Sequence, residues 1–139
     1  MNQHSIDAVA LGGATAMASA DTAVDDNPQH TALRAAWAGW LTPRYAQQIQ
    51  TAKITSPPGA QWDTWYRHRG YVVVAASLSG DDHPPDTATA AARKVVLRER
   101  PVGRDGWRDD PTTVVVAVVL QKVDSKTGNV WRIDSDQPS

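Results

Sequence analysis

The sequence predicts an α+β fold in which two N-terminal helices pack in the concave face of a curved, mainly four-stranded antiparallel sheet. Three observations predict this class. Two short helical patterns that carry Trp residues come first, and Val-rich strand patterns then follow along the rest of the chain. The strands are separated by turns, with no intervening helices. Strands joined in this way are antiparallel, because parallel neighbours require long crossover connections.

Capping signals and apolar spacing mark the two helices. Asn27-Pro28 and Thr42-Pro43 each join a residue that caps a helix to a Pro that suits its first turn. Apolar residues then recur at helical spacing, first at Leu33, Ala36, Trp37, Trp40 and Leu41, and afterwards at Tyr45, Ala46, Ile49 and Ala52. We therefore expect Trp37 and Trp40 to lie in the core.

The segment after the second helix leaves two structures open. Consecutive prolines at 57 and 58 end that helix, because proline lacks the N–H group that a helix requires. Residues 61–69 then form either a third helix, with its aromatic side chains on one face, or an irregular approach to the first strand.

Four strands follow, and each is bounded by turn residues. Residues 71–78 are typical of a buried strand, and residues 89–100 alternate between an apolar and a charged face. Asp105-Gly106 predicts a tight hairpin before the long apolar strand at 112–123. A turn at 126–129 leads to the last strand at 130–133.

Residues 1–26 form a separate region in this prediction, ahead of a single cone-like α+β domain at 27–139. The region holds a weakly apolar run rich in Ala and Gly, and Ala18-Ser19-Ala20 matches the small-residue cleavage pattern of secretory signals. No Lys or Arg precedes the run. We therefore expect a flexible tether or disordered leader, with a signal peptide as the alternative.

Composition excludes several classes of chemistry. The chain has 139 residues, a formal net charge of -1 and no Cys, which excludes disulfides, thiolate nucleophiles and Cys-based metal sites. Four His residues are present, but none is followed at helical spacing by another, and no metal-ligand spacing occurs. A Gly-rich phosphate loop and a Gly-x-Ser-x-Gly nucleophile motif are also missing. We expect no catalytic residue, no cofactor and no metal.

The residues that we expect to contact a partner or line a pocket are aromatic or basic and lie near the predicted hairpin and the first strand. They are Trp62, Trp65, Tyr66, His68, Arg98, Arg100 and Trp107. Trp and Tyr anchor interfaces, whereas His68 has the alternative of a solvated basic edge between two arginines.

A wider group of basic residues runs along the second strand and the hairpin, at Arg93, Lys94, Arg98, Arg100, Arg104 and Arg108. Neighbouring carboxylates partly neutralise this group, which predicts a salt-bridged strand face, with an acidic protein partner as the alternative. Nucleic-acid binding is disfavoured, because it requires a purer basic stripe with stacking aromatics.

Three segments carry a resemblance to a known fold. They are Ala35-Ala36-Trp37-Ala38-Gly39-Trp40-Leu41-Thr42-Pro43, Tyr71-Val72-Val73-Val74 and Asn129-Val130-Trp131-Arg132-Ile133. In their order along the chain they resemble the nuclear transport factor 2-like fold, a cystatin-like cone whose curved sheet wraps an N-terminal helix. The likeness covers residues 28–135.

Within that fold, the chain is most similar to extracytoplasmic domains of actinobacterial and other Gram-positive conjugation systems, whose function is similar to that of the assembly-factor domain of type IV secretion machines. Two departures stand out. Those proteins normally carry a transmembrane helix ahead of the domain, where this chain has the weak apolar run. Residues 104–111 are also more charged than usual.

The resemblance implies a non-enzymatic interaction domain of a conjugative transfer or secretion assembly. It would dock other proteins, associate with copies of itself, and reach a membrane only through a tether outside this chain. It would lie in an extracytoplasmic or membrane-associated place, although the sequence is also compatible with the cytoplasm. The alternative function is a small-ligand binding protein, or an isomerase-like or hydrolase-like enzyme, that uses the cavity of the cone.

Overall fold

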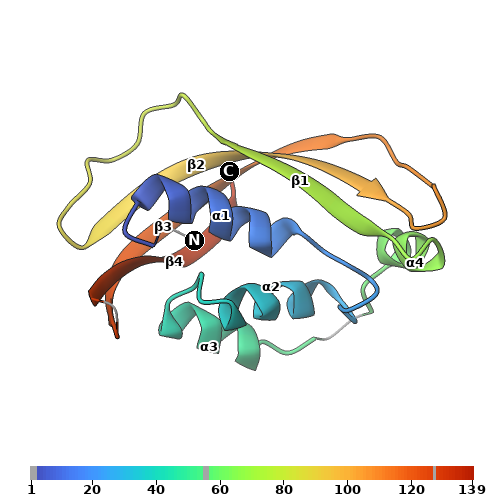
Figure 1. Cartoon of the computed structure of the whole chain (residues 1–139), viewed down its shortest axis with the longest axis horizontal. Coiled ribbons are helices and arrows are strands. Elements are labelled where there is room, and N and C mark those ends of the chain that lie inside the picture. The colour runs from blue at the N-terminus through green and yellow to red at the C-terminus, as the bar shows by residue number, and fades with distance from the viewer. Residues whose placement is uncertain (1–2, 55–56, 127) are drawn as a thin grey trace.

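The computed structural model describes residues 3–54, 57–126 and 128–139, and it confirms the α+β class (Figure 1). Its helices are α1 (Ile6–Ala18), α2 (Pro28–Trp37), α3 (Pro43–Thr51) and α4 (Ala60–Arg67). Its strands are β1 (Tyr71–Leu78), β2 (Ala90–Val102), β3 (Thr112–Ser125) and β4 (Gly128–Pro138). They form one four-stranded antiparallel sheet in the order β1-β2-β3-β4.

The predicted helix starts are confirmed by their capping bonds. The side chain of Asn27 accepts a hydrogen bond from the backbone N–H of His30 at 3.0 Å, and Pro28 opens α2. In the same way the Thr42 hydroxyl accepts the N–H of Tyr45 at 3.2 Å ahead of α3. Each cap satisfies one N–H that the first helical turn leaves unpaired. Of the two structures open for residues 61–69, the helix is the one observed, as α4.

The sheet follows the predicted strands but extends further along the chain. The turn at 103–111 lies where the sequence predicts it. After the second predicted turn, β4 begins at Gly128, two residues earlier than expected, and Thr127 lies outside the described residues. A register shift between Val119 and Leu120 marks a bulge against β4. The interpretation of 71–78 as a buried strand is wrong in one respect: exposed and covered side chains alternate along β1, so one face of this strand meets solvent.

The expected leader is the largest difference between sequence and structure. Residues 6–18 form α1, which lies against all four strands, and Val9 and Ala10 are fully buried. Figure 1 shows α1 directly beneath the curved sheet, with α2 and α3 on its far side. Small residues let α1 come this close to its neighbours: a Cβ on Gly12 would collide with the Trp40 ring, and one on Gly13 with Ile133. Residues 1–2 lie outside the described part.

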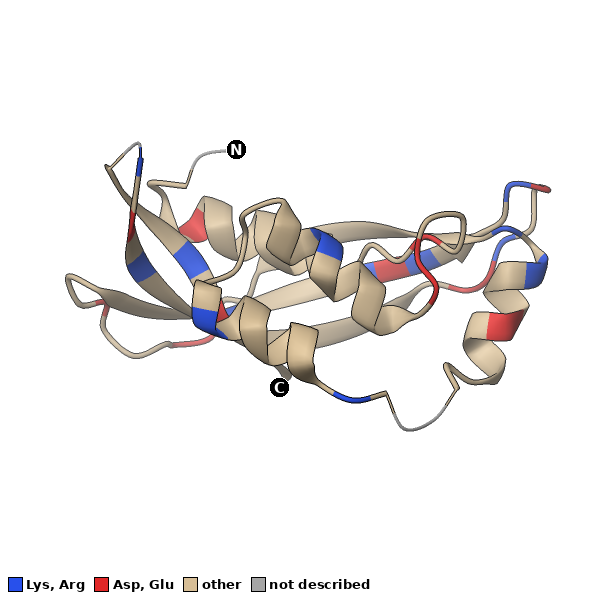
Figure 2. Cartoon of the chain, turned by 90° about the horizontal axis from the view of Figure 1, so that it is seen from below, with Lys and Arg blue, Asp and Glu red and all other residues tan. Residues whose placement is uncertain are grey.

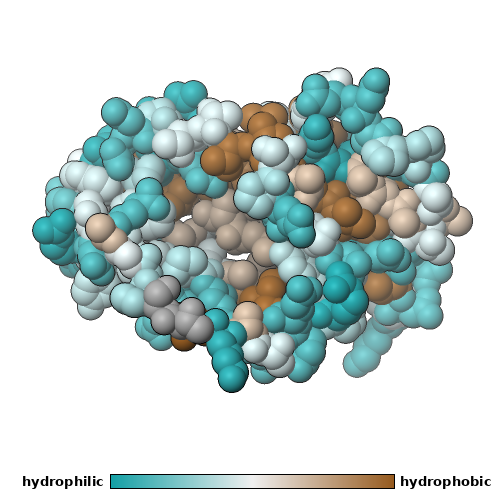
Figure 3. Space-filling model, turned by 180° about the vertical axis from the view of Figure 1, so that it is seen from behind, coloured by the Kyte–Doolittle hydropathy of each residue, from teal (hydrophilic) through white to brown (hydrophobic). Residues whose placement is uncertain are grey.

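Trp37 is a second correction. It is 68% exposed rather than buried, because α2 packs on α1 and α3 and turns its Trp37 side away from the sheet. The exposed ring meets His30 edge-on, at 5.7 Å between ring centroids. Trp40 behaves as expected and packs against the core formed by α1 and the sheet. In Figure 3 hydrophobic residues reach the surface as patches separated by hydrophilic ones.

Candidate functional site

The hairpin between β2 and β3 is held in one shape by two glycines. Gly106 has a φ of 92°, a left-handed conformation that glycine adopts without strain. Gly103 is enclosed: a Cβ there would lie 2.5 Å from Asp105 Oδ1 and 2.9 Å from the Cβ of His68. The hairpin is therefore packed against the end of α4, and the sequence positions 68 and 103–107 meet in space.

His68 and Trp107 form the centre of this contact. The imidazole of His68 stacks on the indole of Trp107, with 4.5 Å between the ring centroids and 2° between the planes. His68 Nδ1 lies 2.7 Å from the carboxylate of Asp105, which also accepts the backbone N–H of Trp107 at 3.0 Å. Hydrogen bonding to His68, above all, holds the pKa of Asp105 below its ordinary value. The hydrogen-bonded pair of His68 and Asp105 therefore fixes the orientation of Trp107.

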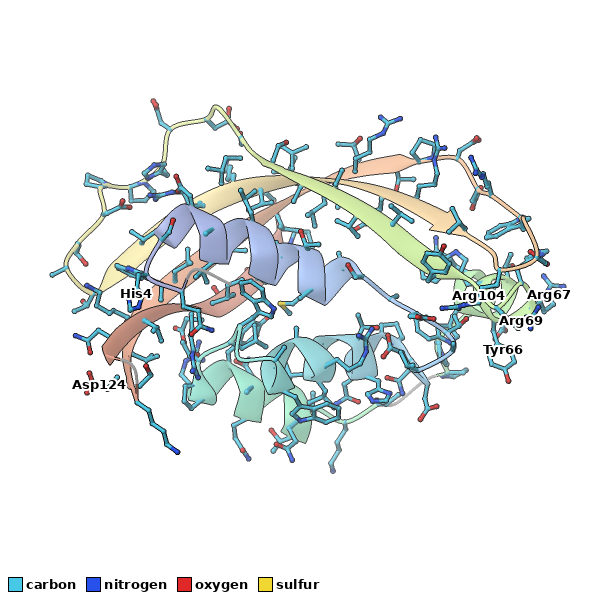
Figure 4. The ribbon with its side chains drawn as sticks, viewed as in Figure 1. His4, Tyr66, Arg67, Arg69, Arg104 and Asp124 are labelled. Carbon is cyan, nitrogen blue, oxygen red and sulfur yellow. The ribbon has the colours of Figure 1, made fainter. Side chains whose placement is uncertain are left out.

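Arg104 ties the hairpin to the chain that leads out of α1. Its guanidinium pairs with the carboxylate of Asp21 at 2.9 Å and donates to the carbonyl of Arg69 at 2.7 Å. It also lies over the ring of Tyr71, 4.8 Å from the ring centroid. Figure 4 shows Arg104 beside Tyr66, Arg67 and Arg69, at the end of the molecule where α4 meets the hairpin.

A pocket opens beside this contact, on the face of the sheet that points away from α1. We call it the hairpin pocket. Its volume is about 360 Å³, and it is lined by Tyr71, Val73, Arg100, Val102, Gly103, Gly106, Trp107 and Arg108. Aromatic rings and aliphatic side chains thus form its walls, and two guanidinium groups supply its charge. Such a surface suits an anionic group that carries an apolar body.

The salt bridges expected along β2 and the hairpin form at three of the six basic residues, one of which is Arg104. Arg93 pairs with Asp7 and Asp86, and Lys94 lies 3.9 Å from Asp81. The remaining arginines, apart from Arg104, have no ion pair with any acidic side chain that the structure describes; they are Arg98, Arg100 and Arg108. Figure 2 shows basic and acidic segments together at the α4 and hairpin end.

The structure brings three of the seven expected partner residues together, namely His68, Arg100 and Trp107. Arg98 lies next to them along β2, in a shallower hollow with Ala75, Ala76, Ser77, Val96 and Thr113. The expectation that Trp62 lies at a mouth or interface is wrong, because its indole is buried against Ala20 and Val72. Trp65 is partly buried in the same cluster, and Tyr66 is 65% exposed.

Sequence reasoning missed three members of the site, which are Asp105, Tyr71 and Val73. Asp105 is only a hairpin residue in the sequence, and its pairing with His68 depends on the fold. Tyr71 and Val73 reach the pocket because odd-numbered residues of β1 face outward. That alternation is the one signal that points to them.

A second pocket lies on the opposite, concave side of the sheet, and we call it the concave pocket. Its volume is about 240 Å³, and it is lined by Ala14, Met17, Ala18, Leu97, Glu99, Val116 and Asp136. Helix α1 packs against the sheet beside this pocket. Burial raises the pKa of Glu99, and it raises the pKa of Asp136 to about 6. The concave pocket is therefore apolar with two carboxyl groups.

We expect Asp136→Asn to stabilise the protein at neutral pH and to have little effect near pH 4. A carboxyl whose pKa is raised by folding contributes stability below its unfolded pKa, and this stability is lost as the pH rises through the folded pKa. Urea unfolding should show the wild type losing about 1–2 kcal/mol relative to the variant between about pH 4 and pH 7. Asp124→Asn, at an exposed position of β3, is the control. The prediction is contradicted if the stability of Asp136→Asn changes with pH in parallel with that of the wild type.

No group of three or more His, Asp or Glu side chains in residues 3–54, 57–126 and 128–139 is arranged to hold a metal ion. None of the helices in these ranges combines the length and the apolar character needed to cross a membrane.

Comparison of the chain with protein-family models, with curated proteins and with solved structures finds no match. The resemblance to the nuclear transport factor 2-like fold therefore stays a prediction from the sequence.

Proposed function

We propose that this chain is a non-enzymatic docking domain of a multiprotein assembly, and that its hairpin pocket binds an acidic segment of a partner protein. The observation that carries the proposal is the cationic and aromatic surface formed by Arg100, Arg108, Trp107 and Tyr71. Guanidinium groups form paired, charge-assisted hydrogen bonds with carboxylates, and Tyr and Trp anchor protein interfaces.

The neighbourhood of the hairpin pocket favours a macromolecular partner over a small molecule. Arg98, together with Ala75 and Ser77, extends the surface along β1 and β2 beyond the pocket itself. On the concave side, α1 occupies the space in which a cone would hold a ligand. A segment of a partner protein would use the extended surface, whereas a small molecule would use only the pocket.

The assembly that we propose is a conjugative transfer or secretion apparatus, and the place of action is extracytoplasmic or membrane-associated. This part of the proposal rests on the resemblance of three sequence segments to domains of Gram-positive conjugation systems. The docking surface suits that role, because an assembly factor works by binding other proteins. The mechanism needs no bond to be made or broken.

Charge reversal at the pocket tests the proposal. We expect the double substitution Arg100→Glu and Arg108→Glu to weaken binding of a short peptide rich in Asp, Glu and Trp by about tenfold or more, since each exposed ion pair contributes up to about 1 kcal/mol. Fluorescence anisotropy of the labelled peptide measures the affinity, and NMR shifts show whether Trp107 responds. Binding should weaken at high salt, because ions screen exposed charges.

Lys126→Glu is the matched control, because it reverses a charge in the turn between β3 and β4, away from the hairpin. It should leave peptide binding within about twofold of wild type. The proposal fails if the peptide leaves the Trp107 signal unchanged at millimolar concentration. It also fails if a single-stranded oligonucleotide binds more tightly than the peptide at the same salt concentration.

A second candidate function is the binding of a small organic cation in the concave pocket. The carboxyl groups of Glu99 and Asp136 favour it, because an ionised carboxylate in apolar surroundings gains from a positive partner. An isomerase-like or hydrolase-like activity would use the same two groups. Thermal shift with a series of small amines separates this function from docking: stabilisation that Asp136→Asn abolishes supports it, and no stabilisation rejects it.

A further inference from the structure

The two edges of the sheet are covered very differently. The β4 edge bonds to segments from elsewhere in the chain: Ile133 donates its N–H to the carbonyl of Trp40 at 2.8 Å and accepts the N–H of Thr42 at 2.9 Å. Further along, Trp131 donates to the carbonyl of Gln3 at 2.8 Å. Charged residues and the bulge also disrupt this edge, which are devices that discourage pairing with another strand.

The β1 edge is covered only where the strand begins. Val72 donates its N–H to the carbonyl of Ala20 at 2.8 Å, and Thr22 donates to the carbonyl of Gly70 at 3.0 Å. Among the described residues, no backbone hydrogen bond is recorded on the outer side of 74–78. The strand has no charged residue, no proline and no bulge against β2. This stretch is an uncovered edge without the usual protection.

The direction of its backbone groups follows from two neighbouring bonds. Val72 bonds outward to Ala20, whereas Ser79 bonds inward to the carbonyl of Lys94 in β2. Inward and outward groups alternate along an antiparallel strand. The backbone N–H and C=O groups that point away from β2 therefore belong to Val74, Ala76 and Leu78.

We propose that this free edge pairs with the same edge of a second copy of the chain, in an antiparallel twofold dimer centred on Ala76. The centre follows from the length of the free segment. Only a twofold axis through its middle residue, Ala76, lets the whole of 74–78 pair with the same segment of the second copy. Val74 of one protomer then exchanges backbone bonds with Leu78 of its partner, and Ala76 pairs with Ala76. Two four-stranded sheets join into one continuous sheet.

The side chains of β1 suit this pairing. On the outward face, Ala75 lies opposite Ser77 of the other copy, and both are small. On the concave face, Val74 lies opposite Leu78, and each is already part of the apolar packing. Arg98 flanks Ala75 on β2, so the arginines of the two copies are at least three strand spacings, or about 14 Å, apart, where salt screens their repulsion.

The absence of charge along this edge is what favours a second copy over a foreign strand. A foreign strand would be selected by charged side chains along the edge, and β1 carries none on 74–78. A strand that is uncharged and small on one face is, in contrast, compatible with itself. Specific interfaces usually bury about 1,200–2,000 Å², and a short strand pairing buries less. We therefore expect a dimer that forms at high protein concentration and dissociates on dilution.

Disulfide trapping tests the register, because the chain has no Cys of its own. Ala75→Cys and Ser77→Cys are prepared as separate proteins and mixed under mild oxidation. In the proposed dimer these two positions are a non-hydrogen-bonded pair, with Cα atoms about 4.5 Å apart, within the range of a disulfide. We expect the mixture to give several-fold more covalent dimer than either protein alone. Gln137→Cys, at an exposed position of β4, is the control and should give little.

A second pair of variants tests association without a crosslink. Ala76→Pro removes a backbone N–H that points outward and is not used by β2, a position where an edge strand tolerates proline. Sedimentation velocity over a concentration series should show the wild type and Ala76→Ser dimerising, and Ala76→Pro remaining monomeric with its circular dichroism unchanged. The proposal is overturned if the wild type stays monomeric at the highest concentration. It is overturned equally if the mixed cysteine proteins crosslink no better than each alone.

Discussion

Replacing Asp25 with Ala is expected to lower the free energy of unfolding by about 2–3 kcal/mol, because it leaves the buried hydroxyl of Thr31 and the partly exposed guanidinium of Arg34 without their acceptor. The carboxylate of Asp25 is fully buried between α1 and α2. Both Nε and Nη2 of Arg34 donate to it, the latter at 2.8 Å. Thr31 donates its hydroxyl at 2.8 Å and Asp21 its backbone N–H at 3.0 Å.

The same contacts give Asp25 a distinct dependence on pH. Burial pushes its pKa upward, but the hydrogen bonds from Arg34, Asp21 and Thr31 outweigh burial and hold the pKa below its ordinary value. A carboxyl with a lowered pKa contributes stability above its unfolded pKa, and this contribution is lost as the pH falls through the folded pKa. The difference between wild type and Asp25→Ala should therefore be full at neutral pH and shrink in acid.

Asp26→Ala is the matched control, because it deletes the neighbouring carboxylate at an exposed position. Its effect on stability should stay within about 0.5 kcal/mol. Urea unfolding followed by Trp fluorescence gives both values. A loss below about 1 kcal/mol for Asp25→Ala would mean that the buried ion pair does not hold α2 against α1.

Gly13→Leu is expected to destabilise the protein by about 3 kcal/mol, at the upper end of the cost of overpacking a core. Gly13 is buried where α1 crosses β4, and even a Cβ at this position would collide with the Ile133 side chain. A larger residue must push α1 away from the sheet. Because α1 contributes Val9, Ala10 and Ala14 to the core, the displacement would open that core to water.

Gly80→Leu provides the control for the Gly13 substitution. Gly80 lies in the exposed loop after β1, and a Cβ there meets nothing within 4 Å. The same change of residue should therefore leave the unfolding midpoint close to wild type. The prediction is contradicted if Gly13→Leu is as stable as Gly80→Leu. That result would mean that α1 is dispensable to the fold, as a flexible leader would be.

The candidate site could be predicted from the sequence only in part. Basic and aromatic residues near the hairpin pointed to His68, Arg100 and Trp107, and these three do lie together. The same reasoning placed Trp62 with them, although its indole is buried beneath β1. It could not show which arginines keep a free charge, because Arg93 and Arg104 find carboxylates on segments far away in the chain. Composition reveals how many charges exist, and only the fold reveals which ones pair.

What the sequence by itself determined about this protein is local: the caps at Asn27 and Thr42, the turn glycine at Gly106, and an antiparallel sheet that follows from short connections. These features depend on residues close together in the chain, so their physical causes are readable there. Only the tertiary structure decided that α1 lies in the core and that Trp37 faces solvent. Burial depends on which surfaces meet: small residues let α1 approach the sheet, and α2 was left with its Trp37 side uncovered.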